Sequence, residues 1–150
     1  MLFRSDPEHR ALAAAVLGGF PEQEAAWRGL VDALLDPSAR VTAFANQALG
    51  SMVVARPMTV DWTPSESVLR RLIAGANLSG FGTLLQVLVS TEISAALAPA
   101  LLVGNDHLIL GHLASASSPH RTTTRRFLTQ LALSDLGPDP TDWRRWIGGL

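Results

Sequence analysis

The sequence predicts an all-α protein of about eight helices, and three observations lead to this class. Apolar residues recur at i, i+3, i+4 and i+7 along most of the chain, which is the spacing of one face of a helix. Strand signals are scarce, because only the short segment Ser51–Arg56 has a β-branched character. A helix–turn–helix pattern also recurs about every 40 residues, as in stacked helical repeats.

Start and stop signals define the helices of the first half. Asp6–Pro7 begins a first helix that ends near Gly18–Gly19. Pro21 opens a second helix, Glu22–Leu35, with acidic residues in its first turn. A third helix follows the Asp36–Pro37 turn and runs from Ser38 to about Ala55. The apolar residues gather on one side of the first helix (Ala11, Leu12, Ala15, Val16, Gly19) and on one face of the third (Val41, Phe44, Ala45, Ala48, Leu49, Met52).

The second half continues in the same way. Thr83–Ser90 is nearly all apolar, which predicts a buried central helix. Ser118–Pro119 is a strong N-cap and first-turn pair, and Gly137–Pro138 ends the helix that it starts. The predicted helices of this half are Ser65–Ala76, Thr83–Ser90, a short Glu92–Ala98 ended by Pro99, Asp106–Ser115, Pro119–Ser134 and a last short helix with Trp143, Trp146 and Ile147.

Three helix pairs share one phase, with second helices that begin near Ser38, Ser79 and Pro119. Within Leu34–Gly50, the sequence DPSARVTAFANQALG resembles the HEAT/armadillo-like repeat families. In the HEAT pattern an Asp/Pro turn precedes a helix with an Ala-x-x-Ala-Leu-Gly-like tail. The resemblance implies HEAT-like stacked helical hairpins. The alternative is an irregular orthogonal helical bundle, and in both cases residues 1–150 form a single all-α domain.

Composition limits the classes of function. The chain has a formal net charge of −1, which argues against binding nucleic acid or anionic membrane over its whole surface. It has no cysteine, so thiolate nucleophiles, thiolate metal sites and disulfides are excluded. The apolar window Leu84–Val103 is interrupted by Glu92 and Pro99, which favours a buried helix pair over a membrane span. We therefore expect a soluble, cytoplasmic protein.

The sequence carries no convincing catalytic signature, so we expect no enzyme activity and no cofactor. Asp106, His107 and His112 are close in sequence, but His107 and His112 are five residues apart and do not share a helix face as metal ligands do. A small helical enzyme using these three residues is the least supported hypothesis, and we expect no metal site. Serines and threonines lack the neighbouring base and orienting group that a nucleophile needs.

Arginine and tryptophan are the residues that indicate binding. Arg121 and Arg125 share a helix face with Arg126 beside them, and Arg144–Arg145 and Arg70–Arg71 could join them. Guanidinium groups suit phosphate or carboxylate. Aromatic residues and Arg are enriched in protein interfaces, so exposed Trp62 and Trp143 are further candidates. The alternatives are that each Arg head lies in water beside an apolar stripe, and that Trp143 and Trp146 cover the last core layer.

The sequence therefore predicts a non-enzymatic macromolecular-interaction module that binds another protein through a helical-repeat surface. Scaffold, adaptor, and inhibitor or immunity-type partner all fit this description. The alternative is a nucleic-acid-backbone binder or a HEAT-like DNA-repair enzyme with an Arg-rich face. A homodimer is compatible with the apolar content of Leu84–Leu102. The predicted binding residues are Arg121, Arg125, Arg126, Arg144, Arg145, Trp62 and Trp143.

Overall fold

A computed structural model of the chain describes residues 6–55 and 58–150, and over these ranges it is all-helical, with no strand. This confirms the predicted fold class. The α-helices are α1 (Pro7–Leu17), α2 (Glu24–Ala33), α3 (Ala39–Ala55), α4 (Glu66–Ile73), α5 (Phe81–Ser90), α6 (Ala98–Leu102), α7 (His107–Ala114), α8 (Arg121–Ala132) and α9 (Pro140–Ile147). Two 3-10 turns, η2 (Thr63–Ser65) and η3 (Ala95–Leu97), precede α4 and α6.

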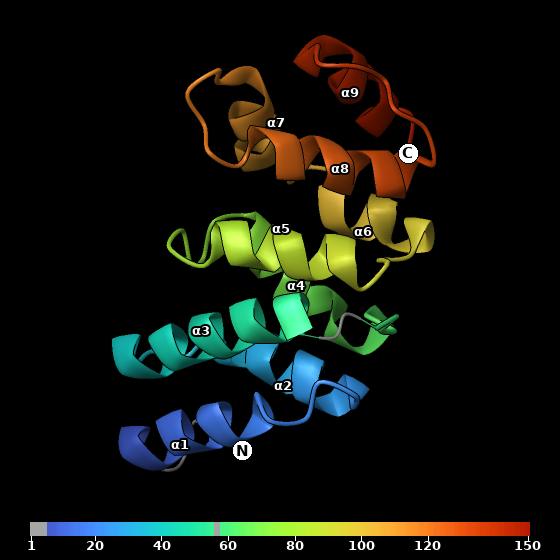
Figure 1. The fold of residues 1–150 in the computed structure, drawn as a ribbon. Helices are drawn as coiled ribbons and strands as arrows, with labels where there is room; N and C mark the ends of the chain where they lie inside the picture. The colour runs from blue at the N-terminus through green and yellow to red at the C-terminus, as the bar shows by residue number, and fades with distance from the viewer. Residues whose placement is uncertain (1–5, 56–57) are drawn as a thin grey trace.

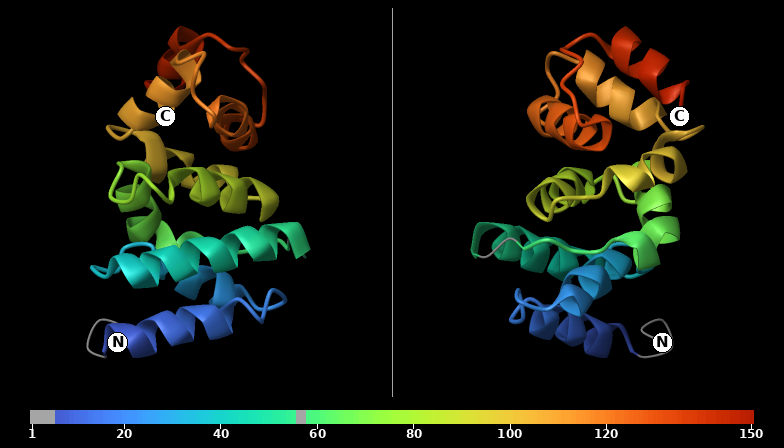
Figure 2. Two further views of the ribbon diagram at one scale, coloured as in Figure 1. Left: turned by 60° about the vertical axis from the view of Figure 1, so that its left-hand side comes forward. Right: turned by 90° about the vertical axis from the view of Figure 1, so that its right-hand side faces the viewer.

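The helices are stacked from one end of the molecule to the other, with the first and last helices far apart (Figures 1 and 2). In one row α3 packs between α1 and α5, and α5 packs against α8. Behind that row α4 contacts α2 and α6, while α7 packs against α8 and α9. The consecutive pairs α2–α3, α4–α5 and α7–α8 are those that the sequence spacing predicts. Membership of the HEAT/armadillo-like families stays a prediction.

Three predicted helix boundaries are wrong. Pro21 does not open α2, which begins at Glu24 with Gln23 as its N-cap, and the N-cap of α8 is His120 rather than Ser118.

The third wrong boundary concerns Pro99. The sequence predicts a short helix that ends at Pro99, whereas the structure has a 3-10 turn over Ala95–Leu97 and begins α6 at Ala98. Pro99 lies in the first turn of α6. A proline is accepted there because the first backbone N–H groups of a helix have no intrahelical partner. The same residue therefore opens a helix rather than ending one.

The core is continuous along the stack and contains three of the four tryptophans, Trp27, Trp62 and Trp143. Helix α5 is buried at six of its ten positions, as its nearly all-apolar sequence predicts. It lies between α3 and α8 in the middle of the row (Figure 1). None of the described helices is both long enough and apolar enough to cross a membrane.

Helix α1 is held to the α2–α3 turn by a buried ion pair. Arg10 Nε and Nη2 donate to Asp36 Oδ2 and Oδ1 at 2.8 and 3.1 Å. The backbone N–H of Ser38 donates to Asp36 Oδ1 at 2.8 Å. Burial raises the pKa of the Asp36 carboxyl, but the hydrogen bonds from Arg10 and Ser38 outweigh it and hold that pKa below its usual value.

Close packing against α3 also holds α1 in place. A Cβ atom at Gly18 would lie 2.9 Å from Cβ of Ala48, which is too short for two carbon atoms. Glycine at this position therefore permits the two helices to approach. Gly50, farther along α3, has no heavy atom within 4 Å of such a Cβ, so it is not a close-packing position.

Candidate functional site

The Arg-rich segment of α8 is largely engaged with the protein itself. Arg121 Nε donates to the backbone oxygen of Leu113 at 3.1 Å. Arg125 Nε and Nη2 donate to the two carboxylate oxygens of Asp135 at 2.9 and 2.7 Å. Arg126 is exposed and forms no ion pair with any residue in the described ranges. Of the three predicted binding residues on α8, only Arg126 therefore presents its charge to solvent without a partner.

A shallow groove of about 310 Å³ follows this segment and is lined by Thr122, Arg125, Arg126, Thr129, Gln130 and Asp135. The bidentate bond from Arg125 and the backbone N–H of Gly137 hold the pKa of Asp135 below its usual value, so the carboxylate is charged at neutral pH. An anionic ligand would therefore meet a negative group inside the groove. This arrangement weakens the case for a phosphate site here.

The remaining predicted arginines do not join the groove. Arg144 and Arg145 are exposed on α9, which packs against α7, and Arg145 pairs with Asp142 at 3.3 Å. Arg70 donates to the backbone oxygens of Ala100 and Val103, and so satisfies carbonyl groups in and just after α6. The structure thus distributes the arginines that the sequence analysis grouped.

The exposure expected of Trp62 and Trp143 is wrong, because both side chains are buried. Trp143 Nε1 donates to the backbone oxygen of Gly137 at 2.8 Å, and its ring meets that of Trp146 edge-to-face at 6.0 Å. This matches the alternative interpretation, in which Trp143 and Trp146 cover the last core layer. Neither Trp62 nor Trp143 is accessible to a partner.

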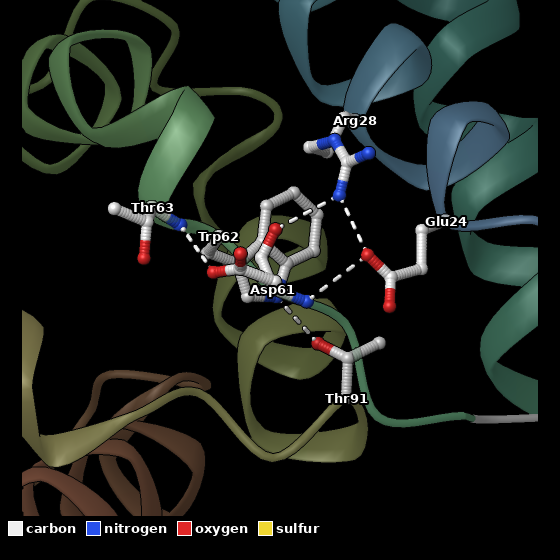
Figure 3. A network of polar contacts seen from close by, with 6 residues as sticks. All are labelled: Glu24, Arg28, Asp61, Trp62, Thr63 and Thr91. Atoms are coloured by element: carbon white, nitrogen blue, oxygen red, sulfur yellow. Dashed lines mark hydrogen bonds and ion pairs between the residues drawn. The ribbon is translucent and has the colours of Figure 1, made fainter.

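Figure 3 shows how Trp62 is fixed within the link between α3 and α4. Its Nε1 donates to Thr91 Oγ1 at 2.9 Å, at the end of α5. Arg28 of α2 bridges Glu24, at 2.7 Å, and the backbone oxygen of Asp61, at 3.0 Å. The link is therefore attached to α2 on one side and to α5 on the other, and the indole buries its face while its N–H stays bonded.

Two histidines form a polar cluster where the α7–α8 loop meets α5. The His112 ring stacks on Phe81 at 4.9 Å and meets His120 edge-to-face at 5.3 Å. His112 Nδ1 lies 2.8 Å from Ser118 Oγ, which also accepts the backbone N–H of His120. Burial, together with the neighbouring His120, lowers the pKa of His112, so its imidazole is neutral at pH 7.

The cluster has the Ser–His contact of a nucleophile and base but not the rest of a catalytic site. In residues 6–55 and 58–150 no carboxylate hydrogen-bonds to either imidazole, and no group of three or more His, Cys, Asp or Glu residues could hold a metal ion. A Cβ on Gly82 would lie 2.3 Å from the His120 ring, so the ring rests directly on the start of α5. The geometry is that of a joint between α5 and the α7–α8 loop.

The surface that the sequence analysis missed lies between α1 and α3, which run side by side (Figure 1). Two surface pockets of about 310 and 260 Å³ meet there at Ala15 and Phe44. Together they form one groove, which we call the α1–α3 groove. Its lining residues are Glu8, His9, Ala11, Leu12, Ala15, Gly18, Arg40, Phe44, Gln47, Ala48 and Ser51.

Large apolar side chains are exposed in and beside this groove. Leu12, Val16 and Phe44 keep 62, 55 and 37 % of their surface accessible. The inward positions of α1 are instead Arg10, Ala11 and Ala14. The sequence predicts that Ala11, Leu12, Ala15 and Val16 share the apolar side of α1. Ala11 is buried, whereas the other three are exposed. The sequence did contain a sign of this surface. The run Ala11–Phe20 has no polar side chain, so α1 has no polar face there that would be expected to lie in solvent.

Comparison of the chain with protein-family models, curated proteins and solved structures finds no match.

Proposed function

We propose that this chain is a non-enzymatic interaction module that binds another protein through the α1–α3 groove. One observation carries the proposal: from Ala11 to its end α1 is apolar on both sides, yet no described residue covers the side with Leu12 and Val16. A helix that is apolar all round is normally buried. Contiguous exposed apolar surface of this kind marks interaction sites in soluble proteins.

The positions where the sequence pattern and the structure disagree support the same surface. Leu12, Val16 and Phe44 follow the helical core spacing but are exposed, whereas most other residues of that spacing in α2, α3 and α5 are buried. In natural proteins, residues that break an otherwise consistent pattern of buried apolar and exposed polar positions are often functional. Burial by a partner would complete the core pattern at all three residues.

The energetics favour a protein partner for this groove. Full burial of a Leu, Val or Phe side chain contributes about 1.5–3 kcal/mol, and roughly half of that remains available at Leu12 and Val16. Several such side chains along one groove give a hydrophobic centre of the kind seen in protein interfaces. An amphipathic helix in a groove is a common form of such recognition.

The alternative function, binding to nucleic-acid backbone through Arg121, Arg125 and Arg126, receives less support. The Arg125 guanidinium is paired with Asp135, and Arg121 Nε is bonded to Leu113. Backbone binding depends on several cationic side chains that contact phosphates and so release the counterions condensed on the nucleic acid. Arg126 and the partly exposed Arg121 do not supply that number.

The test is site-specific photo-crosslinking in a lysate of the source organism. A photoreactive residue replaces Val16 in one variant and Leu133, which is 82 % exposed at the end of α8, in a matched control. We expect protein adducts from position 16 that resist nuclease and high salt and are absent from position 133. Nuclease-sensitive adducts from a third variant at Arg126, with none at position 16, would contradict the proposal and favour the alternative.

A further inference from the structure

The dimensions of the α1–α3 groove are those of a binding site for one short helix. Its lining residues on α1 run from Glu8 to Gly18, and those on α3 run in the same direction from Arg40 to Ser51. At 1.5 Å per residue the groove is about 15 Å long, which is close to three helical turns. In the intact stack α3 already packs against a helix on each side, so a helix is the element that this architecture accommodates.

The charges at the groove do not select a charged partner. Glu8 and Arg40 form an ion pair with each other across its first end. The far end is lined by Gln47, Ser51 and small apolar residues, none of which carries a charge. An occupant of this groove therefore needs an apolar stripe of about three turns and no particular complement of charge.

The chain itself contains a helix with that stripe. On α1, Leu12 and Val16 lie at i and i+4 and are exposed, with the small residue Ala15 exposed between them. Helix α1 has eleven residues, which is the length that the groove accepts. Elsewhere in the described ranges the exposed large apolar residues, such as Val54, Leu78 and Leu133, are isolated from one another in sequence.

We infer that the occupant is α1 of a second copy of this chain, in a two-fold symmetric dimer; the inference rests on the proposed function and names its partner. In such a dimer the two α1 helices lie antiparallel, and Leu12 and Val16 of each copy contact Phe44 of the other. A two-fold axis lets one surface serve both copies and closes the assembly at two. Antiparallel helices also align their dipoles favourably.

The size of the surface sets the expected strength. The exposed apolar surface of Leu12, Val16 and Phe44 is of the order of a few hundred Å² per copy, below the roughly 800 Å² per partner of a stable interface. The dimer therefore dissociates on dilution. Analytical ultracentrifugation of the full chain from about 1 μM to about 200 μM covers the range in which a small interface of this kind dissociates.

We expect the weight-average mass to rise from 16.0 kDa toward twice that value with concentration. Val16→Asp abolishes the rise, since it places a charge within the apolar contact. Leu133→Asp, an equally apolar-to-charged change at an exposed residue outside the groove, leaves it unchanged. We expect both variants to be folded, because Val16 and Leu133 are already at least half exposed, and circular dichroism checks this.

A second measurement fixes the geometry. The chain has no cysteine, so Leu12→Cys introduces a single thiol at the middle of α1, the position closest to the two-fold axis when two eleven-residue helices pair antiparallel. Mild oxidation, in which two thiols lose two hydrogens to an added oxidant such as diamide, joins two copies through one disulfide. We expect rapid covalent dimer from Leu12→Cys and little from Leu133→Cys.

The outcomes separate this inference from the proposed function. The chain could stay monomeric at every concentration while position 16 crosslinks to a different protein. This result would overturn the inference that a second copy occupies the groove, and the groove would remain a protein-binding site. A monomer with no protein adduct at position 16 overturns both. A dimer that Val16→Asp leaves intact places the contact elsewhere and overturns the inference.

Discussion

Two Arg–Asp pairs near opposite ends of the stack have the same local chemistry and different surroundings. In each pair the carboxylate accepts two N–H groups of one guanidinium and a backbone N–H two residues later, that of Ser38 for Asp36 and of Gly137 for Asp135. The side chains of Arg10 and Asp36 are 6 and 1 % exposed, whereas those of Arg125 and Asp135 are 40 and 47 % exposed.

The difference between the two pairs explains the character of the two surfaces beside them. The buried pair fixes α1 against the α2–α3 turn and adds no charge to the exposed apolar surface around Leu12 and Val16. The exposed pair neutralises one cation of the Arg-rich segment on α8. Exposed ion pairs add little stability because water screens them, while a buried charge depends on its partner. An arginine therefore indicates a binding site only after its intramolecular partners are known.

The largest expected effect comes from breaking the buried pair. Asp36→Ala leaves a buried guanidinium without its carboxylate and removes the acceptor for the Ser38 N–H, so we expect the melting temperature to fall by on the order of 10 °C. Asp135→Ala, the matched change at the exposed pair, should lower it by about 2 °C or less. Thermal unfolding followed by circular dichroism measures both. Equal losses would contradict the distinction between the two surroundings.

A smaller effect is expected at the α1–α3 contact. Gly18→Ala adds a methyl group 2.9 Å from Cβ of Ala48 and should destabilise the protein by about 1–2 kcal/mol through overpacking. Gly50→Ala in α3 fills open space in a helix interior and should stabilise it by about 0.5–1 kcal/mol. Urea denaturation gives both values. A neutral Gly18→Ala would mean that α1 adjusts its position freely.

At the other end of the stack, relieving strain should have a modest stabilising effect. Leu133 ends α8 with φ of 55° and ψ of 20°, a left-handed conformation that favours glycine, and its side chain is 82 % exposed. Leu133→Gly should therefore increase the free energy of unfolding by about 0.5–1 kcal/mol. Urea denaturation again measures the change. Destabilisation would indicate that the leucine side chain contributes packing that its exposure does not reveal.

The smallest effect is a dependence of stability on pH at the α5–α7–α8 joint. Because the pKa of His112 is lower in the folded protein than its ordinary value of about 6.5, the stability present above that pH is lost as the pH falls below it. The lowered pKa values of Asp36 and Asp135 act only at more acidic pH, below about 4.

His112→Phe removes the titrating group and keeps a ring that can stack on Phe81. We expect its urea midpoint to vary less than that of the unaltered protein between about pH 7 and pH 5. His107→Phe, a change at an exposed histidine for which no interaction with the cluster is found, serves as the control. An unchanged pH dependence in His112→Phe would assign the acid sensitivity to other groups.

Much of the fold follows from local features of the sequence. Asp6 and Asp139 accept backbone N–H groups at the starts of α1 and α9, as their positions before proline predict. The apolar stripe of α2 with Trp27 and Leu30 is buried as its spacing predicts. These features are predictable because caps and periodic stripes depend on residues within one or two turns of each other.

The candidate site was not predictable in the same way. Spacing groups Leu12 and Val16 into an apolar stripe but does not state whether another helix covers it. Trp62 is in a proline-rich link, where exposure was a reasonable expectation, and its burial depends on Thr91, 29 residues away. Arg125 has no acidic neighbour within one helical turn, and its partner Asp135 is ten residues along the chain.

The sequence by itself therefore determined the all-α class, the succession of helices and most of the core, because each rests on local periodicity and capping. Tertiary structure decided which apolar face stays uncovered and which charges are neutralised. Those properties depend on contacts between segments distant in sequence, as Arg10 with Asp36 and Gly18 with Ala48 show. For this protein the surface proposed for binding is the apolar face on which no described residue packs.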